Sequence, residues 1–367
     1  MTNNLLENIL VKTDNLIERI FHRREEREVV SFRTYLTHPR KILFIPGESL
    51  ADLVLSLSSG FITATAKQFP QADICILVPR AHVCLLENIP RVRAIEYGNR
   101  SSHPFDVNFR RVTAALQEED FDWAVNLTFD AGRAEGLITY HSGAKILTGL
   151  PTPETERYYN LIIKKTPDEP RFRERFSHLF RILQVEGPIK LSSKVIRLTD
   201  QELERGARYV RMRKSRRKTH GFIACVPEWR TEQKSLVRNL QKLLDQLSES
   251  FDPNKLLVAA NLAPEDQISK WENISAHMHI FANLRNMLSS LAACDKVITN
   301  SIGVACLLGS LGVPVGLIPT DEANLSRLNK SERKNIRIIR NEKDRLPLKQ
   351  VLDFALDSFT TQEKSKN

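Results

Sequence analysis

The sequence predicts an α/β protein made of two Rossmann-like halves, each with a parallel sheet covered by helices on both faces, and with a cleft between the halves. Short apolar, β-branched runs alternate with helix-length segments along most of the chain, which is the pattern of parallel βαβ units. The alternation stops at residues 151–170, which are rich in Pro, Glu and Tyr, and a second series starts near His220. At 367 residues, 41% of them hydrophobic, the chain is long enough for two such domains.

The first half is predicted to begin with a buried strand and to alternate up to about residue 148. Apolar runs of this length are typical of strands that are buried on both faces. The predicted strands are Lys41–Ile45, Ile74–Val78, Ala94–Tyr97, Trp123–Leu127 and Ala144–Thr148. The predicted helices are Leu53–Gln68, His82–Asn88, Phe109–Glu118 and Gly132–Ser142.

The second half repeats the same alternation. Its predicted strands are Gly221–Val226, Lys255–Ala260, His279–Phe281, Lys296–Thr299, Val313–Ile318 and Ile336–Arg340. Its predicted helices are Ser235–Ser250, Leu284–Ala293, Val304–Leu311 and Leu348–Ser358, and a further helix at Phe172–Gln184 leads toward it. Two halves of this kind bind ligands in the crevice between them, outside the carboxyl ends of their strands.

The predicted division is a first domain at residues 39–190 and a second at 191–340, with a helical extension at 1–38 and a C-terminal helix and tail at 341–367. Within the extension, apolar residues recur at helical spacing between Leu6 and Phe21, and a charged segment, His22–Arg27, follows. An amphipathic helix of this kind either packs on the protein or a second subunit, or lies on an anionic membrane surface.

The composition of the chain indicates its cellular location and the state of its cysteines. No apolar run approaches the roughly 20 residues of a membrane span and no signal peptide is visible, so a cytoplasmic location is expected, with peripheral contact to the inner membrane left open. The five cysteines are scattered without metal-binding spacing, which favours reduced core residues.

The formal net charge of +10 favours an anionic partner. The densest basic run, Arg205–Lys218, is interpreted as a solvated helix end, with an anion-facing role as the alternative. Nucleic acid is an unlikely partner because no DNA- or RNA-binding motif accompanies the charge.

A segment near the C-terminus has the pattern of a nucleotide site. In Ser289–Thr320, the strand Lys296–Thr299 is followed by the turn Asn300–Gly303 and then by an apolar helix that stops at Gly312. The start of such a helix offers free backbone N–H groups and a positive dipole end to a diphosphate. The alternative is that this unit is only scaffolding, as several units of any doubly wound domain are.

The layout of residues 41–358 resembles that of the bacterial heptosyltransferases of lipopolysaccharide core synthesis, which are glycosyltransferases of family 9 with the GT-B fold. The resemblance rests on the strand Ile42–Pro46, on Ala51-Asp52 where the family has Gly-Asp, and on Phe69-Pro70 after the first helix. It implies that Asp52 is the general base that deprotonates the acceptor hydroxyl. The alternative is that Asp52 only favours the dipole at its helix start.

The resemblance also implies donor-site residues in the second half. Thr231 and Lys234 match the family's contacts to the donor diphosphate, and Glu265 matches an acidic residue that recognises the nucleoside. Ser301 and Gly303 lie at the family's donor turn, where the family has an Asp at position 301 and a His at the position of Cys306.

The resemblance therefore implies an inverting transfer of a sugar, heptose or similar, from a nucleotide-diphosphate donor, possibly ADP-linked, to a saccharide or lipid-linked acceptor of the cell envelope. No metal and no separate cofactor are expected, because basic side chains would carry the phosphate charge. Ser301 and Cys306 support a second hypothesis, a catalytically silent member of the family that acts as a binding or assembly subunit.

Overall fold

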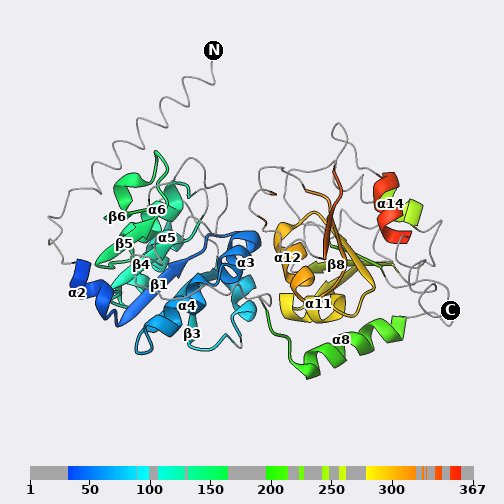
Figure 1. Ribbon diagram of the computed structural model, residues 1–367, viewed down its shortest axis with the longest axis horizontal. Coiled ribbons are helices and arrows are strands. Elements are labelled where there is room, and N and C mark those ends of the chain that lie inside the picture. The colour runs from blue at the N-terminus through cyan, green and yellow to red at the C-terminus, as the bar shows by residue number, and fades with distance from the viewer. Residues whose placement is uncertain are drawn as a thin grey trace, which may run out of the picture.

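The computed structural model describes residues 32–87, 89–98, 106–128, 131–163, 196–213, 223–226, 242–247, 256–261, 278–319, 325, 328, 335–340 and 348–356. These residues form two lobes that lie side by side, each built around one six-stranded sheet (Figure 1). All of the strand pairings in both sheets are parallel. The predicted fold class, two Rossmann-like domains with parallel sheets, is confirmed.

Both sheets have the same doubly wound strand order. The first contains β1 (Lys41–Ile45), β2 (Asp73–Pro79), β3 (Val92–Tyr97), β4 (Trp123–Asn126), β5 (Ile146–Gly149) and β6 (Leu161–Ile162) in the order β3-β2-β1-β4-β5-β6. The second contains β7 (Ile223–Val226), β8 (Leu256–Asn261), β9 (Met278–Phe281), β10 (Lys296–Thr299), β11 (Val315–Leu317) and β12 (Ile336–Ile338) in the order β12-β11-β10-β7-β8-β9. The direction of winding therefore reverses between β1 and β4 in one sheet and between β7 and β10 in the other.

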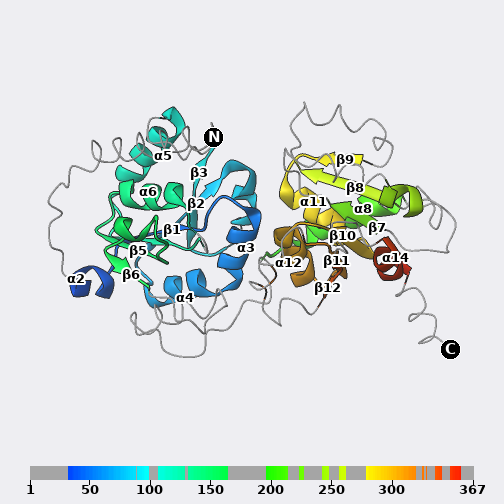
Figure 2. The same cartoon turned by 90° about the horizontal axis from the view of Figure 1, so that it is seen from above.

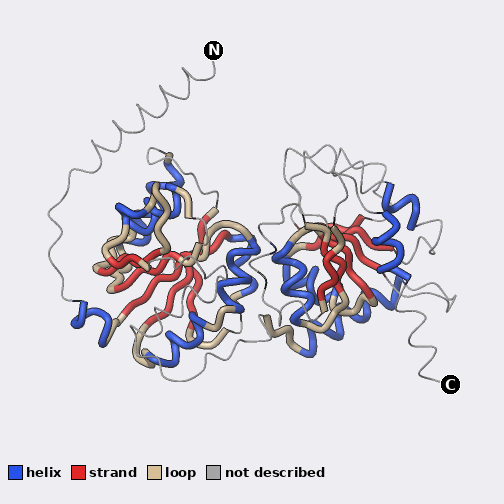
Figure 3. The backbone as a smooth tube through the Cα atoms, turned by 45° about the horizontal axis from the view of Figure 1, so that its top comes forward, coloured by secondary structure: helices blue, strands red, loops and turns tan. Residues whose placement is uncertain are grey.

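Helices cover both faces of each sheet (Figure 3). The described helices are α2 (Phe32–Thr37), α3 (Leu50–Ser58), α4 (Phe61–Gln68), α5 (Val107–Gln117), α6 (Arg133–His141), α8 (Asp200–Arg213), α11 (Leu284–Leu291), α12 (Ile302–Ser310) and α14 (Leu348–Leu356), with short 3-10 helices η1 (Arg80–Leu85) and η2 (Glu156–Tyr158). On the first sheet, α3 and α4 share a core with one face, and α5 and α6 share a core with the other. On the second sheet, α11 and α12 cover one face, and α14 with the helical residues 242–247 covers the other.

The predicted strands match the observed ones to within a few residues, but two helix predictions were wrong and one strand was missed. The single helix predicted at Leu53–Gln68 is two helices, because Gly60 adopts a left-handed conformation with φ of +74° and starts α4. The segment predicted as a helix near His82–Asn88 is the 3-10 helix η1. Strand β6 was not predicted, since two residues carry no recognisable pattern.

Several predictions fall outside the described residues. These are the amphipathic helix of the 1–38 extension before α2, the helix Phe172–Gln184, and the domain boundary at residue 190. The proposed domain limits therefore stay predictions.

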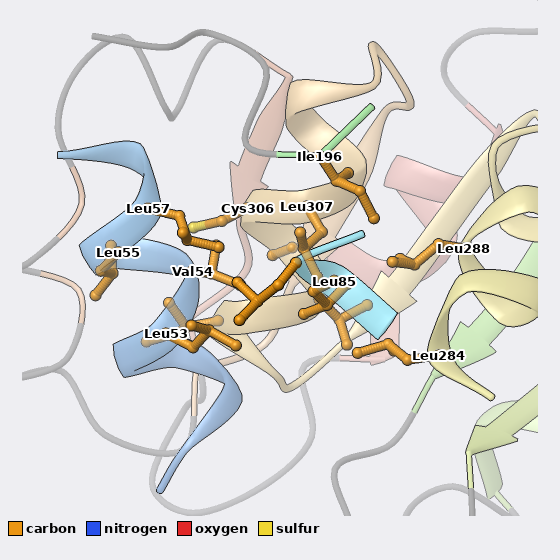
Figure 4. Packing of buried hydrophobic residues seen from close by; sticks show 14 of the residues in the cluster. Leu53, Val54, Leu55, Leu57, Leu85, Ile196, Leu284, Leu288, Cys306 and Leu307 are labelled. Carbon is orange, nitrogen blue, oxygen red and sulfur yellow. The ribbon is translucent and has the colours of Figure 1, made fainter. Parts of the chain in front are cut away.

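One of the three hydrophobic clusters contains residues of both lobes. It joins Phe44 of the first sheet and Leu53 of α3 to Leu307 of α12 and Val297 of the second sheet. Figure 4 shows side chains of α3 and η1 meeting those of α11 and α12, with Ile196 of the connecting segment beside them. Burial of apolar side chains across this contact stabilises the arrangement of the two lobes by roughly 25 cal/mol per Å².

A buried lysine joins the last helix to the second sheet. Lys296 of β10 is 2% exposed, and its ammonium group donates hydrogen bonds to the carbonyl oxygens of Phe354 and Ala355 in the last turn of α14. A cation is favoured at a helix C-terminus, where the free carbonyl groups gather. The C-terminal helix is thus part of the core of the second lobe.

The cysteines are free thiols, and four of the five are buried, as expected of reduced core residues. Among the residues that the structure describes, no helix has both the length and the apolar character that crossing a membrane requires.

Candidate active site at the junction of the two lobes

The strand order of each sheet indicates where a ligand would bind. In doubly wound sheets, ligands bind outside the carboxyl ends of the strands at the point where the winding reverses. In the first lobe this point lies between the ends of β1 and β4, and in the second between the ends of β7 and β10. The segment after β1 leads into α3, and the segment after β10 leads into α12.

Asp52 lies in the first turn of α3 and takes part in a reciprocal cap. Ser49 is the N-cap residue: its hydroxyl accepts a hydrogen bond from the Asp52 backbone N–H at 3.0 Å. The same hydroxyl donates to Asp52 Oδ2 at 2.6 Å. The helix dipole favours a negative charge at this position. The cap therefore fixes a half-buried carboxylate at the carboxyl edge of the first sheet.

Gly47 and Thr128 complete this part of the site. Gly47 has a φ of +93°, and a Cβ atom placed on it would come within 3.2 Å of Asp52 Oδ2 and 3.1 Å of Thr128 Oγ1. Thr128 follows the end of β4, the strand that pairs with β1. Its backbone N–H donates to the Asn126 side chain at 2.9 Å. Thr128 was not predicted as a site residue from the sequence, where its place directly beyond a strand next to the Asp52 strand was the one available indication.

Ser301 caps α12 in the same way that Ser49 caps α3. Ser301 is 3% exposed, and its hydroxyl accepts from the Val304 backbone N–H at 3.4 Å. Its own N–H donates to Thr299 Oγ1, which in turn donates to the Val226 carbonyl oxygen and joins β10 to β7. The Ser301 hydroxyl is thus engaged within its own helix, and Cys306 is 4% exposed within that helix.

The two helix starts touch each other. A Cβ atom on Gly303 would lie 2.7 Å from Leu50 Cγ and 2.9 Å from the backbone nitrogen of Ala51. The absence of a side chain at Gly303 therefore lets the first turn of α12 pack against the backbone that precedes Asp52. Figures 1 and 2 show α3 and α12 facing each other between the two sheets in both views. The structure thus brings together the elements that carry Asp52, Ser301 and Gly303.

A buried ion pair supports the junction from one side. Arg285 of α11 is 3% exposed and makes two hydrogen bonds of 2.6 Å to the Glu202 carboxylate of α8. It also donates to the carbonyl oxygens of Cys84 in the first lobe and Arg197 in the connecting segment. The hydrogen bonds from Arg285 lower the pKa of Glu202 to about 2. One arginine thus holds both lobes and their connection.

Three predicted donor-site residues, Thr231, Lys234 and Glu265, lie outside the described residues. The structure describes only the strands before them, β7 and β8. Their roles, and those of Asp52, Ser301 and Gly303, stay predictions. Within the described part of the chain, no three His, Cys, Asp or Glu side chains are grouped so that they would hold a metal ion.

Two parallel doubly wound domains joined at the carboxyl edges of their sheets define the GT-B class of fold, which is the architecture of this chain. Among solved structures, the chain is similar to ADP-heptose lipopolysaccharide heptosyltransferase II of Escherichia coli, with a TM-score of 0.59 and 19% identity over 88% of this chain and 99% of that one.

Two further structures agree with this fold. A family 9 glycosyltransferase of Veillonella parvula has a TM-score of 0.61 and 12% identity, over 89% of this chain and 98% of that one. The E. coli heptosyltransferase WaaC with ADP-2-deoxy-2-fluoro heptose has a TM-score of 0.55 and 15% identity, over 88% and 99%. No protein-family model and no curated protein matches the chain. The predicted heptosyltransferase-like fold is thereby confirmed.

Proposed function

We propose that this protein is a glycosyltransferase of family 9 type that moves a sugar from a nucleotide-diphosphate donor to a saccharide or lipid-linked acceptor. The observation that carries the proposal is the contact between Gly303 and the backbone at Leu50–Ala51. This contact joins a half-buried carboxylate, Asp52, to the start of a helix that follows the central strand of the other sheet. A base from one lobe and an anion-favouring helix end from the other are what a transfer reaction between the lobes requires.

In the proposed reaction, Asp52 accepts the proton of the acceptor hydroxyl. The acceptor oxygen bonds to the anomeric carbon from the face opposite the diphosphate, so the configuration inverts. The bond between that carbon and the diphosphate oxygen breaks, and its electron pair leaves with the diphosphate. Lys234, Thr231 and the N-terminal end of α12 stabilise the leaving charge, so the reaction needs no metal ion and continues in the presence of a chelator.

We propose an ADP-linked sugar, heptose or similar, as the donor. The support comes from the similar WaaC structures, which were solved with ADP-2-deoxy-2-fluoro heptose and with ADP. Glu265 would contact the nucleoside. A lipid-linked acceptor of the cell envelope places the reaction at the cytoplasmic face of the inner membrane, with residues 1–38 as the candidate membrane contact.

The second candidate is a silent member of the family, and Ser301 favours it. The hydroxyl that stands where the family has an acidic side chain caps its own helix, and Cys306 stands in place of the family's histidine. A silent protein would bind nucleotide, or a partner, without turning over a donor.

Calorimetric titration with ADP, UDP, GDP and CMP tests the proposal, with Lys234→Ala as the variant. We expect one nucleotide to bind and the substitution to weaken it by about 1.5–3 kcal/mol, the range for a hydrogen bond to a charged group. Release of ADP from ADP-heptose in the presence of a lipopolysaccharide-core saccharide as acceptor then separates the candidates: turnover supports the enzyme, and binding without turnover supports the silent member. Failure of all four nucleotides to bind overturns the proposed donor site.

A further inference from the structure

Thr128 carries a buried hydroxyl group without a hydrogen-bond partner among the residues that the structure describes. The residue is 7% exposed. A buried hydroxyl without a partner is uncommon and lowers stability, because its hydration is lost and nothing replaces it. A valine of the same shape would fill the site without that cost. The hydroxyl is therefore a candidate for a function that requires it.

The position of the hydroxyl points to Asp52. Both Thr128 Oγ1 and Asp52 Oδ2 would lie just over 3 Å from a Cβ atom on Gly47, so they face the same side of that glycine. The two residues belong to the segments after β4 and β1, the paired strands at the reversal of the first sheet. Gly47 has no side chain to separate them, and its φ of +93° favours glycine.

The hydrogen bond between Ser49 and Asp52 indicates what a hydrogen bond from Thr128 to Asp52 would do. Asp52 Oδ2 accepts from the Ser49 hydroxyl at 2.6 Å, which directs it toward its own helix. To take a proton from an acceptor, the carboxylate must present an oxygen to the ligand. When it turns from Ser49, a hydroxyl donor on the other side can hold it in the new orientation, and hydrogen bonds from hydroxyl groups to carboxylates are short and strong.

We infer that Thr128 is a positioning residue for Asp52: its hydroxyl donates a hydrogen bond to the carboxylate when the acceptor binds and Asp52 leaves Ser49. The inference rests on the proposed function. The proton of the acceptor hydroxyl passes to Asp52, Thr128 keeps its own proton, and the anomeric carbon exchanges the diphosphate oxygen for the acceptor oxygen. Thr128 acts only through Asp52 and does not bind the nucleotide.

The test compares Thr128→Val and Thr128→Ser with Thr113→Val in the full-length chain. Thr113 is a matched control, because it is 8% exposed and its hydroxyl has a partner, the Phe109 carbonyl oxygen at 3.1 Å in α5. Three quantities are measured: the dissociation constant for ADP, the rate of ADP release from ADP-heptose in the presence of the same saccharide acceptor, and the melting temperature.

We expect Thr128→Val to slow ADP release by about tenfold or more, since a small misplacement of a catalytic group has effects of this size. Thr128→Ser should restore the rate to within about threefold, and the affinity for ADP should stay within about twofold in both variants. The melting temperature of Thr128→Val should not fall below that of the wild type, because the removed hydroxyl has no hydrogen-bond partner in the described part of the chain. Thr113→Val should leave the rate of ADP release unchanged.

Several results would overturn the inference. Wild-type turnover in Thr128→Val would show that Asp52 does not need the hydroxyl. A lowered melting temperature in Thr128→Val would show that the hydroxyl has a structural partner, and a loss of ADP affinity would assign it to the donor. If the wild type binds no nucleotide and releases no ADP, the proposed function falls, and the role of Thr128 falls with it.

Discussion

The segments where α3 and α12 begin, which we call the α3 corner (residues 49–52) and the α12 corner (residues 301–304), have the same backbone arrangement but different side chains. In each, a central strand of a parallel sheet ends, a serine caps the following helix through its hydroxyl, and the helix packs toward the other lobe. The α3 corner carries the half-buried carboxylate of Asp52. The α12 corner has no acidic residue in its first turn, and its residues from Ser301 to Gly309 are buried.

The same strand–turn–helix backbone therefore contributes different features in the two lobes. The α3 corner presents a charged side chain, whereas the α12 corner contributes the helix end and, through Gly303, a close approach. The two lobes therefore share one backbone arrangement, and the acidic side chain lies on the first lobe alone in the first turns of these two helices. The following experiments test whether the two corners differ in function as they differ in content.

The largest expected effect is that of Asp52→Asn on turnover. Loss of a general base slows a reaction by roughly 10²–10⁴-fold, so we expect ADP release from ADP-heptose to fall within that range while ADP still binds. The control is Asp106→Asn, which changes the cap of α5 away from both corners. Equal turnover in Asp52→Asn and wild type would mean that Asp52 only stabilises the start of α3 and is not the general base.

Removal of Glu202 should weaken the support of both corners. In Glu202→Ala, the mostly exposed Glu87, at 3.5 Å, is the remaining carboxylate neighbour of the buried Arg285 among the described residues. Breaking a buried pair at one partner is strongly destabilising, and the partial exposure of Glu202 reduces the cost to about 2–3 kcal/mol. Denaturant unfolding at pH 7 measures it, and a loss below about 0.5 kcal/mol would contradict the role of Arg285.

Acid should remove the same contribution in the wild type. The pKa of Glu202 in the folded protein, about 2, lies below its ordinary value of 4.5. The stabilisation is therefore complete above pH 4.5 and is lost as the pH falls toward 2. Glu119 retains part of the acid sensitivity, because Arg93 and Lys41 also lower its pKa to about 2. We thus expect Glu202→Ala to lose less stability than the wild type between pH 5 and 3, but not to become insensitive to pH.

Gly303→Ala tests the close approach of the two corners. The added methyl group would lie 2.7 Å from Leu50 Cγ and 2.9 Å from backbone atoms, so the helices must move apart. Overpacking of this kind costs about 1–3 kcal/mol. Gly98→Ala is the matched control, because a methyl group there meets nothing within 4 Å. Thermal unfolding of the two variants should differ, and identical melting temperatures would mean that the contact is easily relaxed.

The smallest effects are expected from the two caps. Ser49→Ala and Ser301→Ala should each cost about 0.5–2 kcal/mol of stability, as loss of an N-cap usually does. They should differ in activity: Ser49→Ala should slow ADP release less than Thr128→Val does, because Asp52 leaves Ser49 when the acceptor binds, whereas Ser301→Ala should reduce ADP affinity less than Lys234→Ala does. Unfolding and titration of the pair measure this. A stronger effect of Ser301→Ala than of Lys234→Ala on ADP affinity would assign the Ser301 hydroxyl to the donor.

The strands could be predicted from the sequence because β-branched apolar runs between polar loops have few other structures available. Helix boundaries were harder to predict from the sequence. The left-handed backbone conformation of Gly60 divides the predicted helix in two, and the spacing of the apolar residues around it does not indicate this. Asp52 was found by a family resemblance, whereas Thr128 was missed because an isolated threonine after a strand has no signature. Thr128 becomes a candidate because its hydroxyl has no hydrogen-bond partner among the described residues, and because it lies near Asp52, which is 76 positions away in the sequence.

The hydrogen bonds between Lys296 and α14 affect the order in which the two lobes can fold during synthesis. Lys296 lies in the central strand of the second sheet, but the carbonyl groups that accept its hydrogen bonds belong to Phe354 and Ala355. During synthesis, the charge of Lys296 can be buried with these partners only after residue 355 has been added. The strands of the first sheet are complete at Ile162. The second lobe therefore completes its core later in synthesis than the first lobe completes its sheet.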